Sequence, residues 1–240
     1  HDVLGDDAFF LSIKHYTAKN KLKNVETVDL KKSIEVTTGQ NLDWFFKQWV
    51  YEPGFPEYDV SWTYNQRNKL LSLHVKQVQD LKTTSLFKMP INVLIDNGTV
   101  EEHVIWVEDL DSVFKIHTDK RPRMVVFNSG LKVPSNLKMQ KSVSDLKYQL
   151  INAPNVLDRI WAAQQLSKKK GRKIVEYALL ESAKEDSFWA VRSEAYSSLG
   201  KLKTKANQED FQWIKNNEKD NRVKRSFIRS LRHQLNDNDV

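Results

Sequence analysis

The spacing of apolar residues changes twice along the chain, and this constrains its fold more than any other feature. From residue 1 to about 55, large apolar residues recur at the three- and four-residue spacing of amphipathic helices. From about 56 to 130 they alternate with polar residues, which is the period of strands with one buried face. After about residue 142 the helical spacing returns. The sequence therefore predicts a helical region, a β region and a second helical region.

The first region, 1–55, contains recognisable helix ends. The segment "GDDAFFLSIKHYTAKN" begins with two acidic residues that suit the first turn of a helix. Gly39 is placed to end a second helix in the left-handed conformation. Asn41 is expected to cap a third helix, in which "LDWFFKQWV" presents a broad apolar face.

The second region, 56–130, predicts an antiparallel β-sandwich. Six or so short alternating runs are separated by closely spaced turns. Asn97-Gly98 between two of these runs is a strong hairpin signal. Residues 131–141 contain Pro and few large apolar side chains, so we expect them to be a linker.

The third region, 142–240, contains a repeat. One pattern recurs at intervals of 32 to 33 residues. It consists of a basic residue, a residue with an apolar side chain three positions later and a Leu seven positions later. This period is typical of stacked helix pairs and indicates a compact HEAT-like α-helical domain. The residues in question are Arg159, Ala162, Leu166; Arg192, Ala195, Leu199; and Lys224, Phe227, Leu231.

Composition excludes several classes of protein. With 40% hydrophobic and 29% charged residues the chain has the balance of a globular protein, not a disordered one. No apolar run approaches the roughly 18 residues of a membrane span, so none is expected. The chain has no Cys, which excludes disulfides and thiolate metal sites and leaves the cellular compartment undetermined.

The net charge of +7 is concentrated in the third region. Residues 142–240 hold 19 Lys and Arg against 13 Asp and Glu, so 19 − 13 gives +6 of the total. A basic helical surface can attract nucleic acid or acidic partners, or it can simply be solvated. Basic residues do not alternate with the tryptophans, so a nucleic-acid partner is not expected.

The sequence contains no recognisable active site. Its six histidines include no pair at i, i+4, so the HExxH zinc helix is absent. It also lacks a GxSxG nucleophile motif and a glycine-rich phosphate loop. We therefore predict no catalytic and no metal-binding residue in these 240 positions, and no bound cofactor.

One stretch, "LDWFFKQWVYEPGFP", is unusually rich in aromatic residues. Its tryptophans could stack a ligand, but large aromatic residues at helical spacing more often fill a core or a junction between folded parts. We interpret Trp44 to Trp49 as a junction, after which Pro53, Gly54 and Pro56 turn the chain into the β region.

This stretch, together with "LGDDAFF" and "NVETVDL" upstream, resembles the C-terminal half of the aminopeptidase N-like zinc metallopeptidases, the gluzincin exopeptidases. The resemblance is close from residue 4 to about 60, follows the order of domains thereafter, and is looser over 142–240. It implies that residues 1–55 are the helical end of a thermolysin-like catalytic domain. The residues that carry it most clearly are Trp44, Phe45, Phe46, Gln48, Trp49, Pro53, Gly54 and Pro56.

The resemblance implies a parent enzyme that removes N-terminal residues from peptides with one zinc ion. The zinc helix, the third ligand and the catalytic Tyr of that family belong upstream of residue 1, so we expect the chain to be an inactive piece of a longer protein. Its partners would be its own missing catalytic domain and, through it, peptide substrates. In that family the helical domain walls off the substrate chamber, and Arg159, Arg192 and Arg225 are candidate contacts to a peptide carboxylate.

Two alternatives remain open. Arg159 and Arg192 lie at the repeat position, where packing alone explains a basic residue. The whole chain can also be interpreted as a HEAT-like scaffold without catalysis that binds a protein or nucleic-acid partner, or as an inactive family member with a structural role. An HExxH motif upstream, followed about eighteen residues later by a Glu, would distinguish the enzyme.

Overall fold

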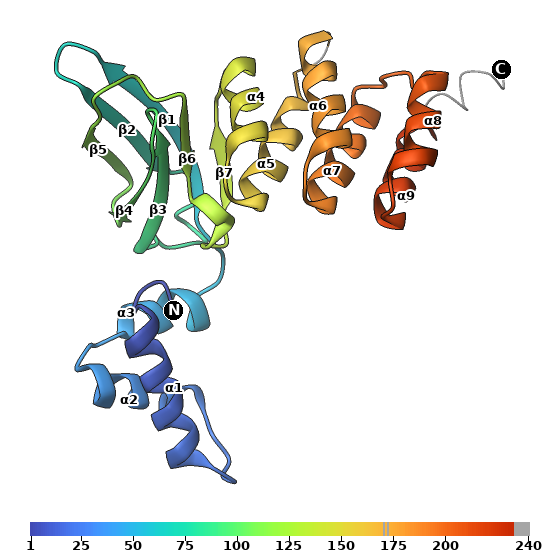
Figure 1. Ribbon diagram of the computed structural model, residues 1–240. Coiled ribbons are helices and arrows are strands. Elements are labelled where there is room, and N and C mark those ends of the chain that lie inside the picture. The colour runs from blue at the N-terminus through green and yellow to red at the C-terminus, as the bar shows by residue number, and fades with distance from the viewer. Residues whose placement is uncertain (170, 172, 233–240) are drawn as a thin grey trace. The chain divides into compact units, whose positions relative to one another are not determined.

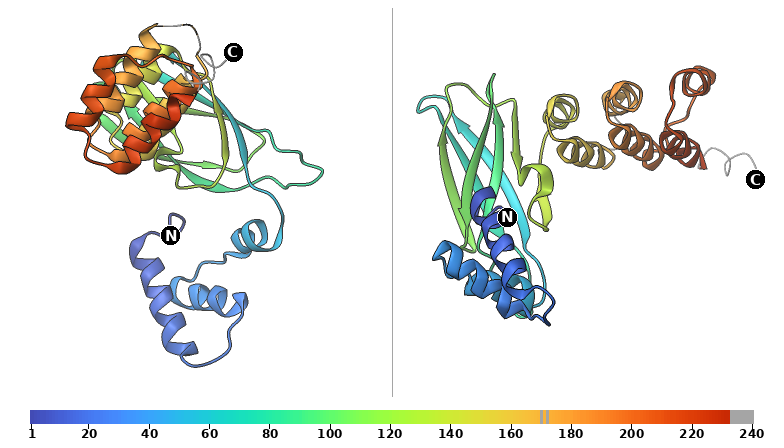
Figure 2. Two further views of the ribbon diagram at one scale, coloured as in Figure 1. Left: turned by 90° about the vertical axis from the view of Figure 1, so that its right-hand side faces the viewer. Right: turned by 60° about the horizontal axis from the view of Figure 1, so that its bottom comes forward.

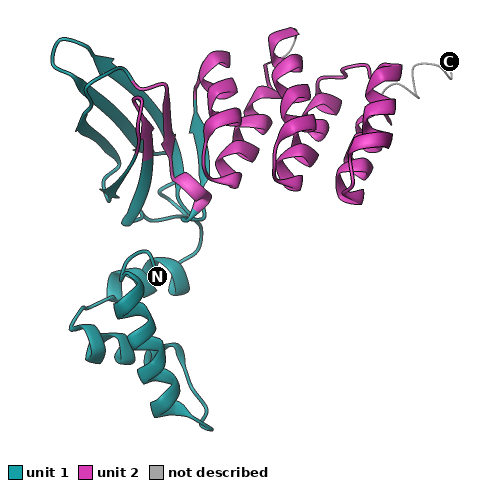
Figure 3. Cartoon of the chain, in the orientation of Figure 1, with its two compact units in different colours: residues 1–93, 101–121, 132–139 teal, residues 94–100, 122–131, 140–240 magenta. Residues whose placement is uncertain are grey.

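The computed structural model describes residues 1–169, 171 and 173–232, and the chain divides into two compact units (Figure 3). The first unit comprises residues 1–93, 101–121 and 132–139, and the second comprises 94–100, 122–131 and 140–240. Helices at both ends and strands between them give the expected mixed α and β architecture. The last eight residues of the expected helical region lie outside the described part.

Residues 1–55 form short helices with little core of their own. The order is α1 (Asp6–Asn20), α2 (Thr27–Thr38), α3 (Asp43–Phe46) and a π-helical turn, η1 (Lys47–Tyr51). The buried apolar side chains here are Ile34, Leu42 and Phe46. At the α1–α2 contact the hydroxyls of Ser12 and Thr37 hydrogen-bond to each other at 2.7 Å. Small polar side chains thus occupy a position where large apolar ones would add more stability.

One of the two predicted helix ends is confirmed. Gly39 follows α2 with φ 68° and ψ 5°, a left-handed conformation that costs glycine least, and its N–H bonds the carbonyl of Glu35. The other is displaced by one residue: the N-cap of α3 is Leu42, and Asn41 lies before it, where its Oδ1 accepts a hydrogen bond from the Asp43 N–H at 2.7 Å.

The β region forms two sheets (Figure 1). One has the strand order β5-β2-β1-β7, and the other has the order β4-β3-β6. The strands are β1 (Glu57–Asn65), β2 (Leu70–Gln77), β3 (Met89–Asp96), β4 (Val100–Val107), β5 (Asp111–His117), β6 (Met124–Phe127) and β7 (Asn136–Met139). Asn97-Gly98 connects β3 to β4, as the hairpin signal predicted.

The four-stranded sheet is mainly antiparallel, and its register follows the alternation in the sequence. Val60 of β1 lies opposite Val75 of β2, and both are buried. Leu73 of β2 is also buried and lies opposite Phe114 of β5. The alternation of apolar and polar residues in the sequence thus predicted correctly which side chains of these strands are buried. Face-to-face packing of the two sheets as a sandwich stays a prediction.

The expected linker, 131–141, differs from the prediction. Residues 136–139 form strand β7, which pairs with β1 in parallel, so the sheet is not wholly antiparallel. The alternation of Asn136 and Lys138 with Leu137 and Met139 is only four residues long, which is too short to stand out among polar neighbours.

Residues of the aromatic stretch in η1 contact the segment at the start of β3. The side chain of Gln48 pairs with the backbone of Lys88, donating to its carbonyl at 2.9 Å and accepting from its N–H at 3.0 Å. Trp49 Nε1 donates to Met89 Sδ at 3.1 Å, and its ring lies 4.9 Å from that of Phe87.

The turn after this junction requires a glycine. Gly54 has φ +93°, and a Cβ at this position would lie 2.5 Å from Oγ1 of Thr84. Both the backbone conformation and the close approach exclude a larger residue.

Within the described part of the second unit, six α-helices follow one another along the chain (Figures 1 and 2). Contacts join α4 to α5, α6 to α7, α5 to α7, and α7 to α9. The helices are α4 (Val143–Asn152), α5 (Val156–Leu166), α6 (Lys173–Glu185), α7 (Trp189–Lys201), α8 (Gln208–Asn217) and α9 (Asn221–Ser230).

The repeat positions lie in the core of this unit. The apolar members of all three sets are at most 8% exposed, and Ala162, Leu166 and Ala195 are fully buried. Equivalent positions of successive helix pairs therefore contribute to one continuous apolar core. Assignment of these pairs to the HEAT class stays a prediction.

A buried lysine lies at the entry to the helical domain. Lys141 is 8% exposed, and its Nζ donates to the Val125 carbonyl and to Gln149 Oε1, each at 2.5 Å. Its Nζ also lies 5.4 Å from the ring of Trp161. Burial lowers the pKa of Lys141 to about 7, although the carboxylates of Asp145 and Asp158 act in the opposite direction.

Asp158 fixes a loop to α5 within the same unit. Its carboxylate accepts hydrogen bonds from Ser129 Oγ at 2.6 Å and from the Gly130 N–H at 2.9 Å. Ser129 and Gly130 belong to a short 3-10 turn, η2 (Ser129–Leu131). Burial raises the pKa of Asp158 in spite of these donors.

Candidate functional site

The candidate arginines lie in the first turns of every second helix, α5, α7 and α9. Arg159 on α5 is almost fully enclosed. Its Nε and Nη2 donate to the two carboxylate oxygens of Asp186 at 2.8 and 3.1 Å. Its Nη1 donates to the carbonyls of Ala153 and Pro154 at 2.9 and 3.2 Å. The Arg159 side chain is 11% exposed and that of Asp186 is 9% exposed.

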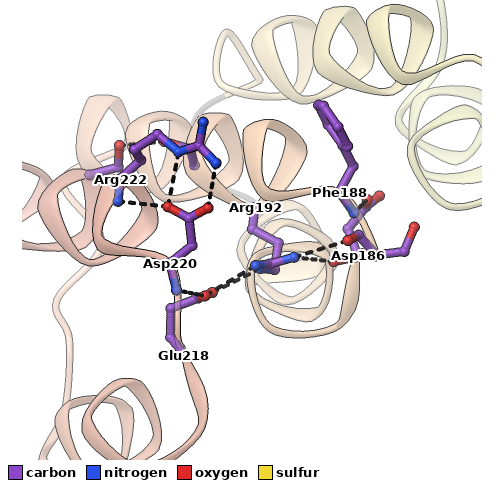
Figure 4. A network of polar contacts seen from close by, with 9 residues as sticks. Asp186, Phe188, Arg192, Glu218, Asp220 and Arg222 are labelled. Carbon is purple, nitrogen blue, oxygen red and sulfur yellow. Dashed lines mark hydrogen bonds and ion pairs between the residues drawn. The ribbon is translucent and has the colours of Figure 1, made fainter.

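Arg192 on α7 repeats this geometry one helix pair later (Figure 4). Its Nε and Nη2 donate to Glu218 at 2.8 and 3.0 Å. Its Nη1 donates to the carbonyls of Asp186 and Ser187 at 2.8 and 3.3 Å. The Arg192 side chain is 16% exposed and that of Glu218 is 2% exposed.

Both carboxylates also bind the backbone that begins the next helix. Asp186 Oδ1 accepts from the Phe188 N–H, and Glu218 Oε1 accepts from the Asp220 N–H, each at 2.8 Å. Burial acts to raise the pKa of Glu218, but hydrogen bonds from Arg192 and the Asp220 N–H leave it below its ordinary value. Each arginine thus joins two helix pairs through a paired, hydrogen-bonded carboxylate.

The carboxylate and carbonyl partners of Arg159 and Arg192 provide a packing reason for a basic residue at these two repeat positions. Both guanidinium groups already donate to a carboxylate and to two carbonyls, which leaves little donor capacity for a peptide carboxylate. A role as substrate contacts stays a prediction for both.

Arg225 is different because it is exposed on α9, with no hydrogen bond or ion pair to any residue in the described ranges. Arg222 and Arg229 are also exposed, at spacings that place them with Arg225 on one side of the helix, and Arg232 is exposed just beyond its end. Of these, Arg222 is engaged: it pairs with Asp220 at 2.7 Å and stacks 3.5 Å from the centroid of the Trp189 ring. Arg225 is therefore the one sequence-predicted arginine that is available to a ligand.

Members of the eight-residue aromatic signature are buried or pack against other side chains of the same chain. Phe46 and Gln48 are 5% and 6% exposed, and Trp44 packs edge-on against Phe45 at 5.8 Å and against Trp106 at 6.0 Å. Lys88 Nζ lies 5.9 and 5.7 Å from the rings of Trp44 and Trp106, so a side chain of the chain itself already occupies this aromatic pair.

The described residues include no group of three His, Cys, Asp or Glu side chains that could hold a metal ion. The HExxH motif is also absent from the sequence. No helix within the described ranges is long and apolar enough to cross a membrane.

Sequence reasoning missed the partners Asp186 and Glu218. Each lies 27 or 26 residues after its arginine, and this near-constant offset was the available signal once the repeat had been recognised. It also missed Lys141, because a buried lysine in an apparent linker is not expected from pattern alone.

Comparison with known proteins supports the fold. No protein-family model matches the chain, and no curated protein matches it in sequence. Among solved structures, aminopeptidase A of Legionella pneumophila, in complex with aspartic acid, matches with a TM-score of 0.67 at 18% identity. The match covers 98% of this chain and 29% of that one. The chain therefore has the fold of part of an aminopeptidase and spans less than a third of that protein.

Proposed function

We propose that the chain is the C-terminal portion of a zinc aminopeptidase that removes N-terminal residues from peptides. In this proposal the chain itself is structural: it shapes and closes the substrate chamber, while a catalytic domain outside these residues holds the zinc. The supporting observation is the likeness over nearly the whole chain to under a third of an aminopeptidase. The close sequence resemblance over residues 4–60 points the same way.

The surface of residues 1–55 also supports a missing partner domain. Several large apolar side chains are exposed there, among them Phe10 at 62%, Leu11 at 52% and Val36 at 68%. Exposed apolar side chains of this kind are compatible with a surface that another domain covers. A catalytic domain that packs on α1 and α2 would cover it.

Two measurements test the proposal. The coding sequence upstream of His1 should contain HExxH and, about eighteen residues later, a Glu. The longer protein should hydrolyse aminoacyl nitroanilides and lose this activity with a zinc chelator, whereas the 240-residue chain should be inactive with or without zinc. Zinc-dependent hydrolysis by the 240-residue chain would contradict the proposal, as would an upstream sequence without zinc ligands.

The role of Arg225 in binding a peptide carboxylate can be tested in the same longer protein. Arg225→Ala should raise KM for tripeptides more than for nitroanilides, which lack the carboxylate. Arg192→Lys, which keeps the charge of an engaged position, is the control. Equal effects of Arg225→Ala on both substrates would contradict the role.

A second function, a scaffold for an acidic partner, is favoured by one observation. Three exposed arginines, Arg225 and Arg229 on α9 and Arg232 just after it, have no ion-pair partner within the described part of the chain. Binding to a DNA duplex that weakens steeply with salt and is lost in Arg225→Gln/Arg229→Gln would support nucleic acid as the partner. Absence of such binding at 50 mM salt would exclude nucleic acid as the partner.

A further inference from the structure

The hairpin between β3 and β4 carries the single Asn-Gly pair of the chain, Asn97-Gly98. An Asn carboxamide can react with the backbone nitrogen of the next residue, because the two groups close a small cyclic imide. A side chain on that next residue hinders the approach, and Gly98 has none. Asn97 is half-buried and Gly98 is exposed, so water can reach the product of such a reaction.

The carboxamide of Asn97 is folded back over the Gly98 amide. Asn97 Oδ1 accepts hydrogen bonds from the Thr99 N–H at 3.4 Å and from Thr99 Oγ1 at 3.3 Å. Because Gly98 lies between these two residues in the chain, the carboxamide has to fold over its nitrogen for Oδ1 to reach Thr99. The two donors also stabilise the negative charge that develops on Oδ1 when a nucleophile adds to the carbonyl carbon.

The nucleophile is the Gly98 nitrogen, and its proton already has an acceptor. The Gly98 N–H donates to Asp96 Oδ1 at 2.8 Å, which is within the hydrogen-bond reach of a general base. The other carboxylate oxygen, Asp96 Oδ2, accepts from the Tyr148 hydroxyl at 2.8 Å. Asp96 is 6% exposed, so its carboxylate is held in place beside the turn.

A positive charge lies next to the same amide. Nη2 of Arg123 is 3.8 Å from the position that a Cβ on Gly98 would occupy. The Arg123 N–H also donates to the Asp96 carbonyl at 2.7 Å, which keeps this residue beside the turn. A neighbouring positive charge favours the anionic form of a group, so Arg123 favours loss of the Gly98 proton.

We propose that Asn97-Gly98 is a self-modification site, at which Asn97 loses ammonia and becomes aspartate or isoaspartate. The Gly98 nitrogen attacks Cγ of Asn97 and forms the new N–C bond of a succinimide ring. The bond from Cγ to Nδ2 breaks, and the Gly98 proton passes through Asp96 to the leaving nitrogen, which departs as ammonia. Water then adds to either carbonyl of the ring and opens it. Because the reaction needs no other partner, it is independent of the proposed peptidase function.

The test is peptide mapping by mass spectrometry, after the 240-residue chain has been incubated in mildly alkaline buffer. The peptide that contains Asn97 should gain the mass difference between an amide and an acid faster than any other Asn peptide of the chain. It should give two products, the aspartate and isoaspartate forms. In guanidinium chloride the unfolded chain loses the contacts of Asp96, Thr99 and Arg123 with the turn, so its Asn97 should react no faster than in the folded chain.

Variants assign the two assisting groups. Asp96→Asn keeps an acceptor for the Gly98 N–H but removes the base, and should slow the reaction of the folded chain about tenfold or more. Thr99→Val removes the hydroxyl donor and should slow it about fivefold, which corresponds to one hydrogen bond. Neither change should affect the rate in the unfolded chain. Asn97→Gln, whose longer side chain would have to close a larger ring, is the matched control and should show no modification at this position.

Several results would overturn the proposal. These are no loss of ammonia at Asn97, a rate in the folded chain well below that in the unfolded chain, or a folded-chain rate that neither Asp96→Asn nor Thr99→Val changes. The second would mean that the hairpin protects the pair. The first and second need no variant, so the proposal stays testable if Asp96→Asn fails to fold.

Discussion

Residues 1–55 and helices α4–α9 are both helical, but they differ in how their helices are held. In the second set, apolar side chains from six helices form one buried cluster, and two buried arginine–carboxylate pairs connect successive helix pairs. In the first set the cluster contains three buried apolar side chains, and hydroxyl groups occupy the α1–α2 contact.

This difference shows that the helical spacing of apolar residues does not by itself indicate that the helices bury their apolar faces within their own unit. A helix is stabilised mainly by burial of its apolar face and only weakly by intrinsic propensity. Helices α5 and α7 bury that face within their own unit, whereas α1 and α2 leave Leu11 and Val36 exposed. The first set is therefore expected to need a further covering surface, and the second is not.

The largest expected effect is on the ion pairs of the helical unit. Arg192→Ala leaves the Glu218 carboxylate buried without its main partner and should lower the free energy of unfolding by about 3–5 kcal/mol. The control is Lys201→Ala, which removes an ion pair to Glu194 whose lysine is 55% exposed and should cost under about 1 kcal/mol. Urea unfolding followed by circular dichroism measures both. Similar costs for the two variants would mean that the buried pairs do not hold the helix pairs together.

A matched pair of leucine truncations compares the two regions directly. Leu166→Ala removes a fully buried side chain from the helical unit and should cost about 2–5 kcal/mol. Leu11→Ala, on α1, removes a side chain that is 52% exposed and should cost under about 0.5 kcal/mol. The unfolding midpoints in urea report the difference. A cost for Leu11→Ala close to that for Leu166→Ala would contradict the comparison.

Lys141 makes the stability of the helical unit depend on pH. Its pKa falls from 10.5 to about 7 on folding, so between these values the unfolded chain binds more protons than the folded one. Stability should therefore rise with pH above 7, by about 2 kcal/mol from pH 7 to pH 9, and decrease as pH falls toward 7.

Lys141→Met provides the control, because it keeps the length of the side chain without the charge. Unfolding of this variant should be nearly independent of pH between 7 and 9. An equally steep rise with pH in Lys141→Met would show that another group causes it.

The smallest of these effects concerns the junction in the first unit. Gln48→Ala removes both hydrogen bonds to the backbone of Lys88 and should cost about 1–2 kcal/mol. Gln40→Ala, at an exposed position, is the control and should be neutral. Amide hydrogen exchange at the start of β3 should quicken in Gln48→Ala. Unchanged exchange there would mean that the side chain does not fix the junction.

The sequence predicted the order of regions, the helix end at Gly39, the start of α3 to within one residue of Asn41, and the hairpin at Asn97-Gly98. Each of these depends on local chemistry: a positive φ, a side-chain cap or a two-residue turn. It missed strand β7, because a four-residue strand paired in parallel with β1 has almost no local signal.

The candidate site was predictable only in part. The repeat identified Arg159 and Arg192 as equivalent positions, but the carboxylates that bind them lie 26 and 27 residues away on other segments. Pairing across helix pairs depends on tertiary packing, and a single sequence shows it only after the repeat is aligned.

The most direct test of the contrast between the two regions is amide hydrogen exchange followed by mass spectrometry. It should be measured on the 240-residue chain and on the longer aminopeptidase of which we propose that this chain is a part. In the 240-residue chain, amides of α5 and α7 should exchange near the rate set by global unfolding, and those of α1 and α2 should exchange far faster. In the longer protein, α1 and α2 should become protected while α5 and α7 change little. Protection of α1 and α2 equal to that of α7 in the 240-residue chain would contradict the account, as would no gain in protection in the longer protein.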